Sequence, residues 1–148
     1  MIKFINLGNE KSAIESLTLL KENKYEDLEI RLYNTHITEL NALLGKKVFK
    51  NDVVYANAMM FWEVMQPLGG KGKHHYHNLT PENVYEALST MHYSEDVTLS
   101  YDERYVIVTL ATIADGISIA AIVTPKGNAK QLNGRNIIKI ITMYPCNK

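Results

Sequence analysis

The spacing of hydrophobic residues changes along the chain, and the change predicts two kinds of secondary structure. In residues 12–23 and 35–45, apolar side chains recur every three or four positions, the period of an amphipathic helix. Residues 58–66, rich in Met and aromatic side chains and ended by Pro67, are predicted to form another helix. From Val97 onward, apolar and polar residues alternate, which is the period of a half-buried strand. The pattern therefore predicts an α+β protein with a helix-rich N-terminal part packed on a C-terminal β-sheet.

Capping residues predict where the helices begin. Ser12 and Glu15 have the spacing of a capping box, and Asn57 is a favourable cap for the helix that follows it. Thr80-Pro81-Glu82 combines a capping hydroxyl, a proline suited to the first turn and an acid near the positive end of the helix dipole. We therefore expect a further helix to begin there.

Four C-terminal segments have the strand period: residues 97–101, 104–114, 117–124 and 136–144. Asp115-Gly116 lies between the second and the third, and this dipeptide predicts a two-residue hairpin turn. No helical pattern separates these segments, so we expect an antiparallel sheet of about four strands. Residues 28–33 and 53–56 are predicted to be two further, shorter strands.

The predicted hairpin has two unlike faces. One face is apolar and suited to a covering of helices, whereas the other is mixed and suited to the floor of a polar cleft. The residues of the mixed face are Tyr105, Thr109, Ser118, Ile122 and Thr124.

Composition narrows the setting of the protein. The length of 148 residues fits a single domain, and the one cysteine, Cys146, excludes an internal disulfide bond. No apolar stretch has the length of a membrane helix, and the N-terminus has no signal-peptide pattern. We therefore expect a fold that does not rely on an oxidising compartment, no membrane partner and a cytoplasmic location, although export without a signal peptide stays open.

The charges are balanced overall but unevenly distributed. The formal net charge is zero, which argues mildly against a nucleic-acid binder. After Asp115, however, no acidic residue follows. Two groups of cations stand out in the sequence: Lys46, Lys47, Lys50, Lys71 and Lys73, and later Lys126, Lys130, Arg135, Lys139 and Lys148. They are either a local positive surface for phosphate or ordinary surface residues.

The segment Lys73-His74-His75-Tyr76-His77 is the strongest candidate for chemistry. Three interpretations of its histidines stay open: metal ligands, a general acid and base, or a solvated loop without a role. A zinc site needs about four ligands, and no partner pair with ligand spacing is present, so we expect neither a metal nor a cofactor. The final strand supplies a second candidate, because Thr142 and Tyr144 lie on one face and place two hydroxyl groups side by side.

The order of these features resembles the phage- and toxin-associated members of the barnase–EndoU–colicin–RelE-like ribonuclease superfamily. The run from His77 to Val84, with its Leu-Thr-Pro-Glu-Asn-Val helix start, is similar to a helix opening of the phage barnase-like domains. The Thr-Met-Tyr-Pro sequence at 142–145 is similar to the Ser/Thr-x-Tyr-Pro ending of EndoU-type nucleases. The resemblance covers residues 50–145 as an α+β core and leaves residues 1–48 as a helical N-terminal region of the same domain.

The resemblance implies metal-independent cleavage of RNA, in which the ribose 2′-hydroxyl attacks the adjacent phosphate. His77 or His75 is then the base or the acid, Lys73 the cation, and Thr142 and Tyr144 orient phosphate and sugar. Further substrate-binding candidates are Arg135, Lys130 and Ser118.

RNA and an immunity or antitoxin protein are the partners that the resemblance implies. The competing hypothesis is a non-catalytic phage or mobile-element accessory protein with the same fold. That hypothesis predicts an exposed apolar patch, with Tyr76, Tyr93 or Tyr101 in it, instead of a cleft with convergent titratable groups. The sequence does not indicate the oligomeric state or the RNA that is cut.

Overall fold

The computed structural model describes residues 2–69, 74–112, 115–128 and 136–146. Within them the chain forms seven strands: β1 (Phe4–Asn6), β2 (Glu29–Tyr33), β3 (Val54–Asn57), β4 (Asp96–Leu99), β5 (Val106–Thr112), β6 (Ile117–Asn128) and β7 (Asn136–Cys146). The helices are α1 (Glu10–Glu22), α2 (Asn41–Leu44), α3 (Ala58–Val64) and α4 (Pro81–Ser89), with 3₁₀ turns η1 (Ile37–Leu40) and η2 (Met91–Tyr93). The α+β class predicted from the sequence is confirmed.

The described strands form one mixed sheet in the order β1-β2-β3-β7-β6-β5-β4. Strands β4 to β7 pair antiparallel, as predicted, whereas β1 pairs parallel with β2 and β3 parallel with β7. The expectation of about four strands is therefore wrong. Of the other three, β2 and β3 correspond to the two shorter strands predicted at 28–33 and 53–56, whereas β1 was not predicted. Because β1 and β2 lie within residues 1–48, this region is not purely helical.

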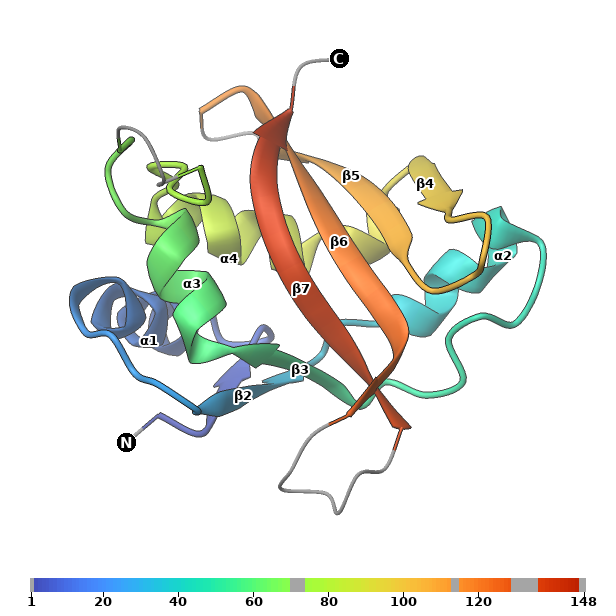
Figure 1. The fold of residues 1–148 in the computed structure, drawn as a ribbon, viewed down its shortest axis with the longest axis horizontal. Helices are drawn as coiled ribbons and strands as arrows, with labels where there is room; N and C mark the ends of the chain where they lie inside the picture. The colour runs from blue at the N-terminus through green and yellow to red at the C-terminus, as the bar shows by residue number, and fades with distance from the viewer. Residues whose placement is uncertain (1, 70–73, 113–114, 129–135, 147–148) are drawn as a thin grey trace.

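Helices cover one face of the sheet. Helix α4 passes behind β6 and β7, and α3 lies beside β7 (Figure 1). The covered face of β5 and β6 has the predicted apolar residues, of which Val106, Val108, Ile119 and Ala121 are fully buried. Burying such side chains contributes roughly 1.5–3 kcal/mol each and supplies most of the drive for this packing.

Two of the three predicted helix starts are confirmed. The Asn57 side chain accepts a hydrogen bond from the Met59 N–H, and Thr80 forms a reciprocal capping box with Asn83. The first start is wrong, because α1 begins three residues early and Asn9, not Ser12, is its cap. Asn is as good a cap as Ser, so sequence pattern alone does not separate the two positions.

The β5–β6 hairpin has the predicted faces but a different register. A two-residue turn at Asp115-Gly116 would pair Ile117 with the residue just before the turn, whereas Ile117 pairs with Thr112. The register differs by two residues, and because side chains alternate with a period of two, each one keeps its face. Strand β6 also continues through Pro125 to Asn128, and β7 continues through Pro145, beyond the predicted ends.

The other face of β5, β6 and β7 has no described helix in front of it (Figure 1). Its cross-strand register aligns Ser118 with Cys146, Ala120 with Tyr144 and Ile122 with Thr142. Since Met143 between them is fully buried, Thr142 and Tyr144 project from the outer face. The predicted mixed face is therefore the open surface of the sheet.

Candidate active site

The histidine segment is held in place by the residues that follow it. The Asn78 N–H donates to the carbonyl of Gln66 at 2.8 Å, and the Leu79 N–H donates to the carbonyl of Val64 at 3.0 Å. Leu79 is 2% exposed and belongs to the main core. These bonds tie the segment to the C-terminal end of α3 immediately before α4 begins.

Aromatic packing fixes the segment further. The ring of Tyr76 meets the ring of Trp62 on α3 edge-to-face, with centroids 5.6 Å apart. Such aromatic pairs contribute about 0.5–1.5 kcal/mol beyond their buried area. Tyr76 is half-buried in this contact and is not one of the fully exposed side chains that the accessory-protein hypothesis expects in its apolar patch.

The structure brings His77 and Tyr144 together although 66 residues separate them. Their ring centroids lie 6.4 Å apart, with the planes inclined at 51°. Tyr144 is on the outer face of β7, so the histidine segment lies over the end of the open sheet surface. The two rings are therefore neighbours. The convergence of Lys73, His77, Thr142 and Tyr144 in one cleft, which the ribonuclease hypothesis expects, stays a prediction, as do the chemical roles of these side chains.

A cleft of about 360 Å³ adjoins this pair, between α3, the histidine segment and β7. Its volume lies in the ~300–1,000 Å³ range of small-molecule sites. The cleft is lined by Asn57, Met59, Met60, Glu63, Val64, His75, Ile141 and Thr142. Two predicted site residues, His75 and Thr142, thus line one hollow.

The cleft exists because β7 extends beyond the end of β3, its neighbouring strand on one side. Strand β3 pairs with β7 only as far as Ile140, and then Asn57 starts α3, which diverges from the sheet. A register shift between Ile122 and Val123 of β6 lies opposite the same point of β7. Such a bulge bends the strand and redirects side chains, which here leaves Ile141 exposed at the rim.

The electrostatic environment favours neutral His77. Partial burial of the ring lowers the pKa of His77, and the neighbouring His75 and His74 lower it further. The rings of His74 and His75 are themselves 4.0 Å apart. A neutral imidazole at neutral pH can accept a proton, which is the property that a general base needs.

Glu63 is a cleft residue that the sequence did not reveal. It is the only charged residue of α3, whose other members are apolar or aromatic. A single carboxylate in such a helix is a usable signal, because an isolated charge survives on an otherwise buried helix only where the helix meets water or a partner. Asn57 was identified as a helix cap but not as part of the cleft wall.

The remaining predicted residues are distributed as follows. Ser118 lies on the same outer face as Thr142 and Tyr144, one row beyond Tyr144. Lys73, Lys130 and Arg135 lie outside the described residues, and their roles stay predictions.

The described residues contain neither a metal-binding cluster nor a membrane-spanning helix. No three side chains of His, Cys, Asp or Glu there are grouped so that they could hold a metal ion, which gives the metal-site interpretation of the histidines no support. No helix in the described part of the chain has the length and apolar character needed to cross a membrane.

Comparison with protein-family models, curated proteins and solved structures finds no match to this chain. The likeness to the barnase–EndoU–colicin–RelE-like superfamily therefore rests on the short motifs of the sequence.

Proposed function

We propose that the chain is a metal-independent endoribonuclease, of the kind used as a toxin or effector, whose centre is the His77–Tyr144 pair. The observation that carries this proposal is the contact between the His77 imidazole, whose pKa is lowered, and the Tyr144 phenol near the C-terminal end of β7. The adjoining cleft supplies a second imidazole from His75 and a hydroxyl from Thr142.

In this mechanism His77 takes the proton from a ribose 2′-hydroxyl. The freed oxygen attacks the adjacent phosphorus, the bond to the 5′-oxygen breaks, and a 2′,3′-cyclic phosphate remains. His75, which lines the same cleft as Glu63, gives a proton to the departing 5′-oxygen. The general base and acid each contribute roughly 10²–10⁴-fold to such a reaction.

In this mechanism the hydroxyl groups of Thr142 and Tyr144 donate hydrogen bonds to the phosphate. Both project from the outer face of β7, and neither has a hydrogen-bond partner among the described residues. Preorganised donors of this kind stabilise the negative charge that develops on the phosphate oxygens. Hydroxyl groups without a partner in the described part of the chain are available for this purpose.

The test is cleavage of a fluorescent RNA oligonucleotide by the purified protein in EDTA, compared with a copy that lacks the 2′-hydroxyl groups. We expect cyclic-phosphate products from the RNA only. His77→Ala should lower the rate by at least about 100-fold, the contribution of one general base.

His36→Asn is the matched control. His36 lies in the left-handed region at φ 52°, which asparagine tolerates, and its nearest charged partner is Glu39, outside the cleft. Unchanged cleavage by His77→Ala would remove His77 from the mechanism. Absence of cleavage by the parent protein, with tight binding of a partner protein instead, would favour the accessory-protein hypothesis, for which exposed Tyr93 and Tyr101 are the candidate contacts.

A further inference from the structure

A second hollow near the opposite end of β7 gathers lysines from distant parts of the chain. It measures about 170 Å³ and is lined by Lys46, Lys47, Val48, Lys50, Glu103, Pro125 and Lys126. Three of the lysines come from the segment between α2 and β3, whereas Lys126 belongs to β6. The sequence showed two separate basic groups, and the fold joins part of each.

A bulge in β6 places Lys126 in this hollow. The β6–β7 register shifts between Thr124 and Gly127, so the intervening residues leave the regular ladder. A bulge of this kind re-aims the side chains that it contains. A side chain at Gly127 would be tight, because a Cβ there would lie 3.0 Å from the Lys139 side chain and 3.2 Å from the Ile137 carbonyl.

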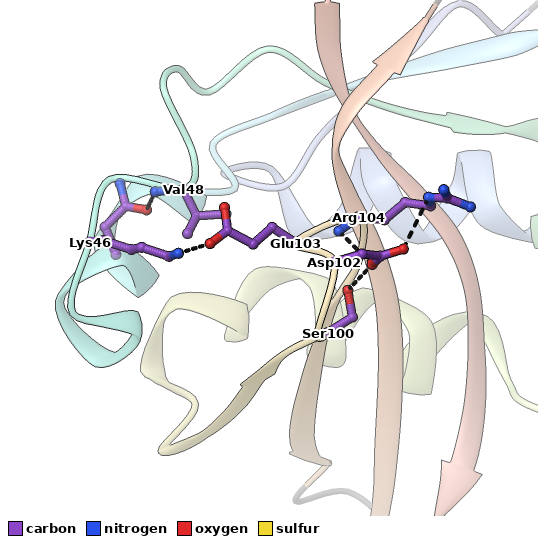
Figure 2. A network of polar contacts seen from close by, with 7 residues as sticks. Lys46, Val48, Ser100, Asp102, Glu103 and Arg104 are labelled. Atoms are coloured by element: carbon purple, nitrogen blue, oxygen red, sulfur yellow. Dashed lines mark hydrogen bonds and ion pairs between the residues drawn. The ribbon is translucent and has the colours of Figure 1, made fainter.

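The carboxylates near the lysines are already engaged. Glu103 forms an ion pair with Lys46, and Asp102 accepts hydrogen bonds from the Ser100 hydroxyl and the Arg104 N–H (Figure 2). These hydrogen bonds lower the pKa of Asp102, which therefore stays ionised and bound within its own turn. Among the described residues, no carboxylate pairs with the three other lysines of the hollow: Lys47, Lys50 and Lys126.

An intermediate hollow connects this lysine hollow with the active-site cleft. It measures about 480 Å³, shares Glu103 and Lys126 with the lysine hollow and shares Ile141 with the cleft. The lining of the intermediate and lysine hollows contains five cations, Lys46, Lys47, Lys50, Arg104 and Lys126, and two carboxylates, Asp102 and Glu103. The three hollows therefore follow one another along β7 with an excess of positive charge at one end.

We infer that this row of hollows is a track for a single nucleic-acid strand, with the lysine hollow binding phosphates several nucleotides from the His77–Tyr144 pair. From Tyr144 to the part of β7 opposite Lys126 is about six residues, or roughly 20 Å at ~3.3 Å per residue. That length suits on the order of four nucleotides, the short end of single-strand sites. Cleavage along the track rests on the proposed function, whereas binding of the strand does not.

Binding is measured by fluorescence anisotropy with a labelled ten-nucleotide strand that lacks 2′-hydroxyl groups and cannot be cleaved. The combined variant Lys47→Ala, Lys50→Ala, Lys126→Ala should weaken binding by at least about tenfold in 50 mM salt. The slope of log affinity against log salt concentration should fall in magnitude by about 2, since each phosphate contact on a single strand contributes ~0.7.

The control removes the same charge elsewhere: Lys3→Ala, Lys11→Ala, Lys21→Ala, at positions that line none of the three hollows. It should lose less affinity and keep a steeper salt slope than the first variant. Equal losses in the two variants, or no binding by the parent protein, would overturn the inference.

Cleavage separates this inference from the proposed function. With RNA, the first variant should raise KM for a ten-nucleotide substrate far more than for a dinucleotide, which is too short to reach the lysine hollow. If the parent protein binds the strand through these lysines but cuts no RNA, the track stands and the ribonuclease proposal fails. If the KM increase is the same for both lengths, the lysines do not act at a distance from the cut and the track fails.

Discussion

The two ends of β7 differ in the kind of polar group that the fold collects there. Near Tyr144 the groups are imidazoles and hydroxyls, of which His77, Thr142 and Tyr144 are half-buried. The histidine segment is held there by Leu79 and the Tyr76–Trp62 contact. Near Lys126 they are exposed ammonium groups with few counter-ions. The first set is suited to moving protons, and the second to holding phosphate without chemistry. A net charge of zero conceals this separation, because the charge is arranged in space and not along the sequence.

The largest expected effect that tests the comparison is at the Tyr144 end. Tyr144→Phe removes a hydroxyl that has no hydrogen-bond partner among the described residues, so the fold should lose little stability. If the hydroxyl stabilises the charged phosphate, kcat should fall by roughly 10–100-fold, near the lower range for loss of one such donor. Rates are measured with saturating RNA, and thermal unfolding is measured in parallel.

Tyr101→Phe is the control for this change, since Tyr101 is fully exposed and lies in another turn. The affinity of Tyr144→Phe for the ten-nucleotide strand without 2′-hydroxyls should change less than its kcat. A fall in affinity with an unchanged kcat would mean that the Tyr144 end also only binds the strand. The division into a proton-transferring end and a phosphate-binding end of β7 would then be wrong.

Local signals predicted local structure, whereas the sheet required contacts that no local signal encodes. Asn57 and the Thr80 capping box were predicted because caps depend on a few adjacent residues. Strand β1, of only three residues, was missed because it is stabilised by pairing with β2, whose partner residues lie 27 positions away in sequence. The hairpin register was missed for a similar reason, although the faces were right.

The candidate site also has residues that local sequence signals predicted and residues that only the fold brings together. His75, His77, Thr142 and Tyr144 were chosen by residue type and a short motif, and the fold brings His77 to Tyr144 and His75 to the cleft of Thr142. Glu63 was missed, because a helix with one carboxylate does not show which cavity it faces. The lysine hollow was missed as a unit, because a β-bulge in β6 joins residues 76 or more positions apart.

A smaller effect is expected from removing a counter-ion at the Lys126 end. Glu103→Gln should release Lys46 from its ion pair and add one available cation to the track. We expect the ten-nucleotide strand to bind about two- to fivefold more tightly in 50 mM salt, with a salt slope steeper by about 0.7. Anisotropy titrations at several salt concentrations measure both quantities.

Glu39→Gln is the matched control, because Glu39 is a comparably exposed acid whose partner is His36 and which lines none of the three hollows. Equal gains in the two variants would indicate a general charge effect and not a local one. Weaker binding by Glu103→Gln would show that the Lys46–Glu103 pair builds the hollow instead of restraining it.

The smallest expected effect concerns the influence of the neighbouring histidines on the pKa of His77. Burial is the largest cause of the lowered pKa of His77, and His75 and His74 contribute after it. The double variant His74→Asn, His75→Asn should therefore move the pKa of His77 upward, but not fully to the ordinary value of histidine, because the burial remains. A general base works only when neutral. In the pH profile of any residual cleavage, the rise in activity on the acid side should therefore move to higher pH together with the pKa of His77.

The direct measurement is an NMR titration of the His77 ring, with His36→Asn as the control variant that should leave the pKa of His77 unchanged. A His77 pKa that stays unchanged in the double variant would mean that burial alone keeps this imidazole neutral, and that the Tyr144 end owes nothing to neighbouring charge.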